Sequence, residues 1–134
     1  MIELRPWSDG DLRVAERCLA DPEMMEHLGG PQSRVQILEA HARYLDAGRS
    51  GTGQMFEVVL GASSEPVGSI GYWKKTWQDQ LVYEAGWMIY TEHQGRGLAS
   101  EAVAMLIPRL TRDHGRRFLL AFPSVANPPS NEIC

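Results

Sequence analysis

Two glycines that flank an arginine, in the stretch EHQGRGLASEA, have the residue types and spacing of an anion-binding loop. They follow an apolar, aromatic run and precede a helical pattern, so we expect them where a strand turns into a helix. The first turn of a helix has N–H groups without an intrahelical partner, and its dipole adds partial positive charge. Glycine has no Cβ that would hold an anion away from these donors. We therefore predict that a phosphate or pyrophosphate is bound by backbone N–H groups of Gly95, Arg96, Gly97, Leu98 and Ala99, with the Arg96 charge beside them.

Other interpretations of this loop are open. The glycines can be turn residues alone, which is common between a strand and a helix. A P-loop is excluded because no Gly-Lys-Ser/Thr sequence follows. A Rossmann dinucleotide loop is disfavoured because GRGLAS has serine where the third glycine or alanine belongs, and because too little sequence follows for a second βαβ half.

The first half of the chain is expected to form a strand followed by three helices. IELRPW alternates apolar and polar residues, as a strand does. Asp9 is expected to cap the first helix, and DPEMMEHLGG to form the second, with Asp21 as its cap and Gly29 as its end. The third helix is predicted over residues 32–47 and is expected to end at Gly48. Its inward stripe would consist of Val35, Leu38, Ala42 and Leu45.

The second half changes to strand periodicity. QMFEVVL and PVGSIGYW are expected to pair as a hairpin through GASSE, and WQDQ to turn the chain into the strand LVYEAGWMIY. A helix over 97–113, kinked at Pro108, and a strand over 117–122 would complete a βαβ unit. The predicted fold class is α/β (α+β): one domain, residues 1–134, with a mixed, mainly antiparallel central sheet flanked by helices.

The stretch QGRGLA, from Gln94 to Ala99, resembles the Q/R-x-x-G-x-G/A signature of the GNAT superfamily of N-acetyltransferases. LRPWSDGDL, DPEMMEHLGG, VGSIGYW, YEAGWMIYTEHQGRGLASEA and NPPSNEIC are similar, in this order, to the branch that includes the ribosomal-protein N-terminal acetyltransferases. The resemblance covers nearly all of the chain. It implies a GNAT-like fold, acetyl-CoA as co-substrate, and a primary amine as acceptor, either a protein N-terminus or a small molecule.

The resemblance also implies which residues hold the cofactor. In that family the loop amides bind the CoA pyrophosphate, and the preceding strand pairs its backbone with the pantetheine arm. An asparagine after the following strand contacts the cofactor, and an N-x-x-S pattern follows in this branch. The predicted CoA-binding set is Trp87, Met88, Ile89, Gln94, Gly95, Arg96, Gly97, Leu98, Ala99, Ser100, Asn127 and Ser130.

Acetyl transfer to an amine needs a base for the amine and a donor for the oxyanion. Glu84, enclosed by apolar and small residues in LVYEAGWM, is the predicted general base, and the family resemblance indicates the same residue. The alternative is that Glu84 lies on a solvated strand face, since a bulge can change which face a residue takes. The predicted oxyanion donor is a backbone N–H around Met88 or Ile89.

The family pattern usually continues with an L-G-F segment and further strands, often with a tyrosine before them, and none of this follows Cys134. We therefore expect a C-terminally truncated fold whose open sheet edge a second copy could cover as a homodimer. The alternative function is an acyl-CoA-binding or interaction module without turnover. A nucleotide-binding domain that uses the same loop is a third, less favoured function. No acid for the leaving thiolate is assigned among Tyr72, Tyr83 and Tyr90.

Composition argues against several other classes of function. The chain has 13 Lys+Arg and 17 Asp+Glu, a net charge of −4, so it lacks the basic surplus of nucleic-acid-binding proteins. No apolar run approaches the roughly 20 residues of a membrane span, and MIELRPWSDGD does not have the features of a signal peptide. The histidines and cysteines have no metal-ligand spacing, so no metal is expected. Cysteines without a CxxC pair fit a cytoplasmic location.

Overall fold

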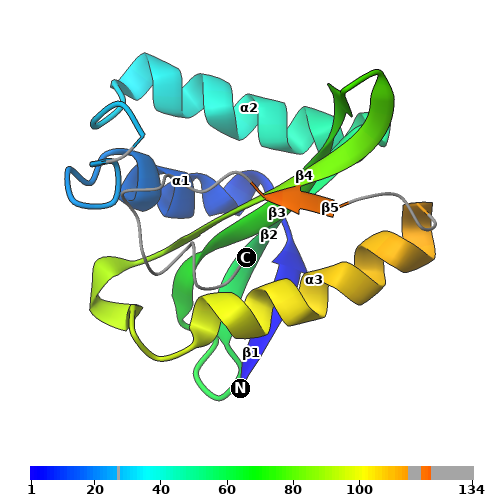
Figure 1. Ribbon diagram of the computed structural model, residues 1–134. Coiled ribbons are helices and arrows are strands. Elements are labelled where there is room, and N and C mark those ends of the chain that lie inside the picture. Colours follow the sequence, from blue (N-terminus) through cyan, green and yellow to red (C-terminus); the bar gives the residue numbers. More distant parts are fainter. Residues whose placement is uncertain (27, 115–118, 122–134) are drawn as a thin grey trace.

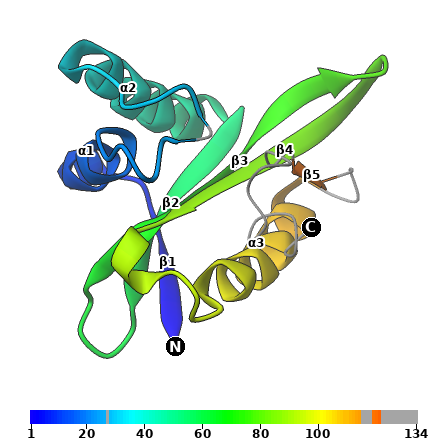
Figure 2. The same ribbon diagram turned by 60° about the vertical axis from the view of Figure 1, so that its left-hand side comes forward.

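A computed structural model describes residues 1–26, 28–114 and 119–121. A sheet with the strand order β1-β2-β3-β4-β5 forms the middle layer. Helices α1 and α2 cover one face of the sheet and α3 covers the other (Figures 1 and 2). The elements are β1 (Ile2–Pro6), the 3₁₀ turn η1 (Asp9–Asp11), α1 (Leu12–Leu19), α2 (Arg34–Ser50), β2 (Gly53–Leu60), β3 (Pro66–Trp77), β4 (Gln80–Ile89), the 3₁₀ turn η2 (Thr91–His93), α3 (Leu98–His114) and β5 (Leu119–Ala121).

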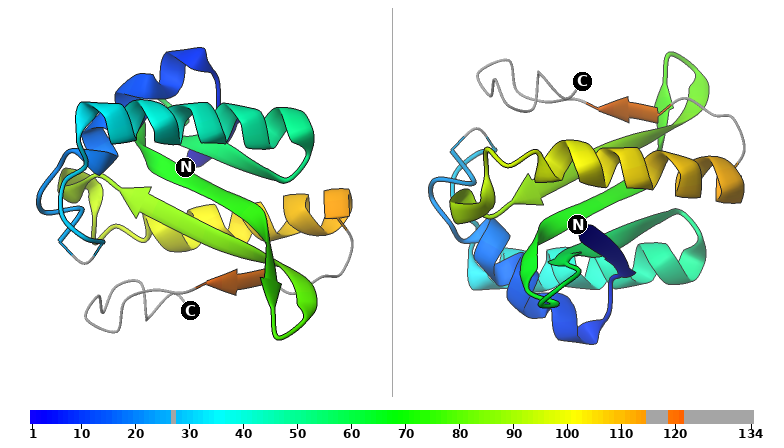
Figure 3. Two further views of the ribbon diagram at one scale, coloured as in Figure 1. Left: turned by 90° about the horizontal axis from the view of Figure 1, so that it is seen from above. Right: turned by 90° about the horizontal axis from the view of Figure 1, so that it is seen from below.

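The first four strands are antiparallel neighbours, and β5 pairs in parallel with β4. Figure 3 shows β5 along the edge of the sheet beside β4. Helix α3 makes the connection between these two parallel strands, so the predicted βαβ unit and the mixed, mainly antiparallel sheet are confirmed.

The two hairpins set the register of the sheet. β2 and β3 pair as predicted around GASSE. The turn between β3 and β4 consists of Gln78 and Asp79, both with positive φ (50° and 62°), and Trp77 pairs with Gln80. Two residues with positive φ form the type I′ turn that matches the twist of a hairpin. Because the length of this turn fixes which residues of β3 and β4 pair with each other, Trp73 of β3 lies directly opposite Glu84 of β4.

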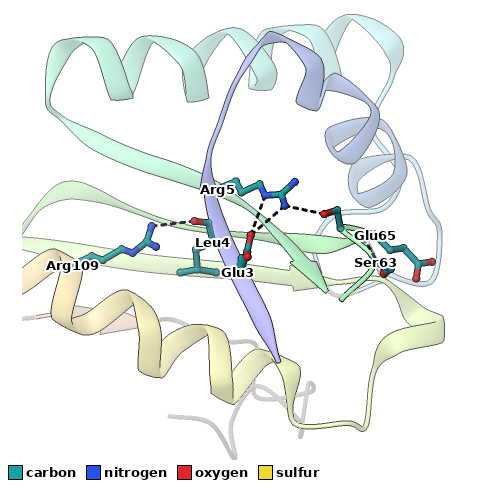
Figure 4. A network of polar contacts seen from close by, with 7 residues as sticks. Glu3, Leu4, Arg5, Ser63, Glu65 and Arg109 are labelled. Atoms are coloured by element: carbon teal, nitrogen blue, oxygen red, sulfur yellow. Dashed lines mark hydrogen bonds and ion pairs between the residues drawn. The ribbon is translucent and has the colours of Figure 1, made fainter. Parts of the chain in front are cut away.

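Alternate residues of the strands face two separate cores. One core lies between the sheet and α3, where Ala102, Leu106 and Leu110 are buried as the helical pattern predicts. Arg109 of the same helix donates from Nη1 to the Leu4 carbonyl oxygen at 3.2 Å, as Figure 4 shows. Its guanidinium also lies 5.0 Å from the centre of the Phe56 ring, so it joins α3 to β1 and β2.

The other core lies between the sheet and helices α1 and α2, and there the predicted stripe of α2 is wrong except at Leu45, which is partly buried against this core. Val35 and Leu38 are exposed, at 64% and 42%, whereas Ile37 and Ala40 are buried. The sequence contains two overlapping apolar stripes, and packing against the sheet selects the one that includes Ile37. The helix also continues past Gly48 to Ser50 and ends at Gly51, whose φ is 77°.

Two helix starts differ from the prediction. Residues 22–26 and 28–29 form turns instead of a second helix. The Asp21 side chain does accept from the backbone N–H groups of Glu23 and Met24, at 2.8 and 3.4 Å, but the capped turn does not continue into a helix. At the first helix, Asp9 does not form the cap. Ser8 and Asp11 form a capping box at the 3₁₀ turn that leads into α1, in which the Asp11 carboxylate accepts from the Ser8 N–H at 2.7 Å.

Candidate active site

The glycine loop lies between η2 and α3, where the sequence pattern predicts it. Gly95 and Gly97 have φ values of 80° and 75°, in the left-handed region that favours glycine. A Cβ built at either position would meet nothing within 4 Å. The backbone conformation therefore favours glycine here, and the space beside both residues is open.

The start of α3 presents N–H groups without an intrahelical partner beside this space. The Glu101 N–H donates to the Gly97 carbonyl oxygen at 3.0 Å, which is the first bond of the helical ladder. The N–H groups of Leu98, Ala99 and Ser100 therefore precede the helix's own hydrogen bonding. The Leu98 side chain is buried and anchors this turn to the core beneath α3. Together with the positive end of the helix dipole, these N–H groups can bind an anion.

Side chains before the glycines fix the position of the loop. Gln94 donates from Nε2 to the Ile89 carbonyl oxygen at 2.9 Å, so the loop is held against the end of β4. Arg96 Nη1 lies 3.5 Å from Nδ1 of His93, and the buried His93 ring has Nε2 3.9 Å from a carboxylate oxygen of Glu65. The Arg96 guanidinium is thereby kept next to the exposed glycines.

Strand β4 has a backbone edge on the side away from β3. The Tyr90 N–H donates to the Val67 carbonyl oxygen at 2.8 Å, and the Met88 carbonyl oxygen lies against Gly68, so both residues direct their backbone towards β3. Because successive residues of a strand alternate, Trp87 and Ile89 direct their N–H and C=O groups the other way. The described pairs of β4 with β5 are Tyr83–Leu119, Glu84–Leu120 and Ala85–Ala121. Among the described residues no strand pairs with Ile89 on this side, so its N–H can serve as an oxyanion donor, whereas the Met88 N–H faces β3.

Glu84 is held by two side chains of β3 on the face covered by α1 and α2. Its side chain is only 15% exposed, so it does not occupy a freely solvated strand face. Oε1 accepts from Trp73 Nε1 at 2.8 Å, and Oε2 accepts from Lys75 Nζ at 2.7 Å. The carboxylate has a fixed orientation, with a cationic amine on one oxygen and an indole N–H on the other.

The sequence matches the "Acetyltransferase (GNAT) domain" family over residues 2–134. The chain belongs to the GNAT acetyltransferase family. As a member of this family it is an acetyl-CoA-dependent acyltransferase, which confirms the class of enzyme predicted from the sequence. A comparison with curated proteins finds no match.

Solved acetyltransferase structures share the fold. An acetyltransferase from Agrobacterium tumefaciens str. C58 is 24% identical with a TM-score of 0.84, over 98% of this chain and 75% of that chain. RimL, a ribosomal L7/L12 alpha-N-protein acetyltransferase in complex with coenzyme A, is 17% identical with a TM-score of 0.81, over 98% and 76%. A spermidine N-acetyltransferase from Vibrio cholerae, in complex with CoA and spermine, is 19% identical with a TM-score of 0.77, over 98% and 76%.

Of the remaining residues named from the sequence of this GNAT chain, some lie outside the described residues and others are buried. Asn127, Ser130 and Cys134 lie outside the described residues. Tyr72 and Tyr83 are buried on the α3 face, with ring centres 5.8 Å apart. Burial, more than the neighbouring charges, raises the pKa of Tyr90 to about 12, so this phenol keeps its proton at neutral pH. Within the described part of the chain, no group of three or more His, Cys, Asp and Glu could hold a metal ion, and no helix is long and apolar enough to cross a membrane.

Two features near the site were not predicted. The first feature is the pair Trp73 and Lys75, the partners of Glu84. The sequence would predict these partners only if Gln78 and Asp79 alone were assumed to form the turn, because the length of the turn sets which residues of β3 and β4 are neighbours. The second feature is a hydrogen-bonded pair of buried carboxyl groups, Asp11 and Glu57, on the same face of the sheet. Burial and then the contact with Asp11 raise the pKa of Glu57 to about 7, against the opposing effect of nearby arginines. No local pattern links these two positions.

Proposed function

We propose that this GNAT domain transfers an acetyl group from acetyl-CoA to a primary amine, either a protein N-terminus or a small-molecule amine. The observation that carries the proposal is the arrangement along β4. A fixed carboxylate, Glu84, precedes a backbone edge formed by Trp87 and Ile89, and this edge leads to the open glycine loop. Solved structures of similar fold include proteins described as acetyltransferases of a ribosomal protein's α-amino group and of spermidine.

In the proposed complex the loop holds the pyrophosphate, with the N–H groups of Leu98, Ala99 and Ser100 and the charge of Arg96 as donors. The pantetheine arm runs along the edge of β4 that faces away from β3, where it pairs with backbone groups of Trp87 and lies beside Ile89, whose carbonyl oxygen accepts from Gln94. Gln94, Gly95 and Gly97 shape the loop, and Met88 supports the edge from the side facing β3. Asn127 and Ser130 remain predicted cofactor contacts.

The proposed reaction uses the Glu84 carboxylate as the base. It accepts a proton from the acceptor ammonium, directly or through water, and the amine then attacks the thioester carbonyl carbon. The Ile89 N–H stabilises the oxyanion that forms. The carbon–sulfur bond breaks, and the thiolate of CoA takes up the second proton released by the amine.

The first test is calorimetric titration of the chain with acetyl-CoA. Micromolar binding, about −8 kcal/mol, is expected and should be abolished by Gly97→Trp. Gly51→Trp is the matched control, because Gly51 has a similar φ of 77° and open surroundings but lies at the end of α2. Equal binding of acetyl-CoA by the wild type and both variants would refute the proposal that the glycine loop binds the cofactor.

Turnover is tested separately by following release of the CoA thiol with a peptide N-terminus or spermine as the amine. Thiol release that depends on the amine and is lost in Glu84→Gln supports acetyl transfer. Binding of acetyl-CoA with no turnover on any amine would instead support a module that only binds acyl-CoA.

A further inference from the structure

An amine of the chain itself already lies against the carboxylate proposed as the base. Lys75 Nζ is 2.7 Å from Oε2 of Glu84, while Trp73 Nε1 holds Oε1 at 2.8 Å. A general base must lie about 2.6–3.2 Å from the group whose proton it takes. Lys75 therefore lies where this base can take a proton from it.

The Lys75 side chain also has the access and the reach that an acceptor needs. It is 42% exposed, whereas the Glu84 side chain is 15% exposed. Trp87 is on the edge of β4 that faces away from β3, beyond the described pairs with β5, and lies three residues beyond Glu84, which is about 10 Å at 3.3 Å per residue. The amine stands on a flexible four-carbon stem, so it can move towards a thioester that lies along this edge.

We propose that Lys75 is a site of self-acetylation, modified within the same chain by acetyl-CoA bound at the glycine loop. This inference rests on the proposed function, because it uses the same cofactor and the same base. Because Lys75 belongs to the same chain as the bound cofactor, its amine reaches the thioester without a bimolecular encounter.

The step balances without a further reactant. The Lys75 ammonium gives one proton to Glu84, and the neutral Nζ attacks the carbonyl carbon of the thioester. As the carbon–nitrogen bond forms and the carbon–sulfur bond breaks, the amine's second proton goes to the CoA thiolate. The products are an acetamide on Lys75 and free CoA, and Glu84 releases its proton to solvent.

The chain contains its own control for this proposal. Lys74 and Lys75 are its only lysines. They are neighbours on β3, so their side chains leave the sheet on opposite faces, and only Lys75 is on the side of Glu84. Direct chemical acetylation by acetyl-CoA should modify both, whereas acetylation assisted by Glu84 should select Lys75.

The experiment incubates the whole chain with acetyl-CoA and follows each lysine by fragment-ion mass spectrometry. We expect Lys75 to be acetylated at least about a hundredfold faster than Lys74, the lower range of what a positioned base contributes. The rate constant should not change with protein concentration. Glu84→Gln should reduce the rate at Lys75 to that at Lys74, and Lys74→Arg should leave the rate at Lys75 unchanged.

Trp73→Phe is the second variant, in case Glu84→Gln does not fold. It keeps an aromatic ring but removes the indole N–H that orients Glu84, so it should slow Lys75 and not Lys74. Equal rates at both lysines, or a rate constant that rises with protein concentration, would overturn the proposal. So would an unmodified Lys75 in a sample that acetylates spermine, and the proposed function would then stand. A folded chain that does not bind acetyl-CoA would refute both.

Discussion

Replacing Glu57 by glutamine should make the protein more stable at alkaline pH and leave it nearly unchanged at acidic pH. Glu57 belongs to β2 and is only 9% exposed, and its pKa is raised from 4.5 to about 7, first by burial and then by Asp11. In the folded chain its neutral carboxyl shares a hydrogen bond with Asp11. Glutamine has nearly the same shape, carries no charge, and can donate to Asp11 through its amide.

The sign of the pH effect follows from the direction of the shift. The folded Glu57 keeps its proton above the pH at which the unfolded one loses it, so folding takes up a proton between about pH 4.5 and pH 7. The stability that this group contributes is fully present below the unfolded pKa. It is lost as the pH rises through the folded pKa.

The magnitude follows from the same pKa values. A rise in pKa from 4.5 to about 7 corresponds to at most about 3 kcal/mol in the free energy of unfolding. Arg5 and Arg13 oppose the rise and stabilise the charged form, so we expect about 1–3 kcal/mol. Glu57→Gln should exceed the wild type by this amount at about pH 8 and match it within about 0.5 kcal/mol at about pH 4.

The assay is urea unfolding of both proteins across this pH range, with Glu39→Gln as the control. Glu39 lies on the exposed side of α2, so its replacement should not produce a pH-dependent difference. A difference between Glu57→Gln and the wild type that stays constant with pH would refute the reasoning. A difference that increases towards acid would show that Glu57 is charged in the folded protein and paired with arginine.

Three further predictions test other parts of the structure. Ile37→Ala should reduce the free energy of unfolding by about 2–5 kcal/mol, whereas Leu38→Ala should change it by less than about 1 kcal/mol, because only Ile37 is buried. Urea unfolding measures both variants, and equal losses of stability would contradict the assigned buried face of α2. Arg109→Met should lose about 1–3 kcal/mol, since both its hydrogen bond and its ring contact disappear, and unchanged stability would mean that neither matters. Trp73→Phe should lower kcat for a free amine without weakening acetyl-CoA binding, because it removes a donor to Glu84; thiol release and calorimetry together measure this, and an unchanged kcat would contradict it.

The local features of the fold could be predicted from the sequence. The glycine loop, the hairpin around GASSE and the βαβ unit depend on turn residues and periodicity within a short window, and the structure confirms each of them. The helix predicted over 21–29 failed although its cap is present. Gly29 and Gly30, with φ values of 93° and 86°, allow the chain to leave the helical path at the end of this segment.

Features that depend on distant packing could not be predicted. Two stripes of α2 have equally good helical spacing, and only the surface of the sheet decides between Ile37 and Leu38. Glu84 could be named from its neighbours in sequence, but its partners Trp73 and Lys75 depend on the length of a turn that WQDQ leaves ambiguous. Asp11 and Glu57 meet only after β2 has paired with β1, so no local pattern brings them together.

The alternation along β4 limits how this chain can change in length. One strand supplies the Glu84 carboxylate to one face of the sheet and the Trp87 and Ile89 backbone groups to its edge, so both depend on the same two-residue period. A single inserted residue between Glu84 and Ile89 would turn the edge groups towards β3 and exchange the residues facing the two cores. Two inserted residues would restore the alternation and move the base one step further from the loop. Insertions into this strand should therefore be tolerated in pairs, whereas the GASSE turn, outside this period, can vary one residue at a time.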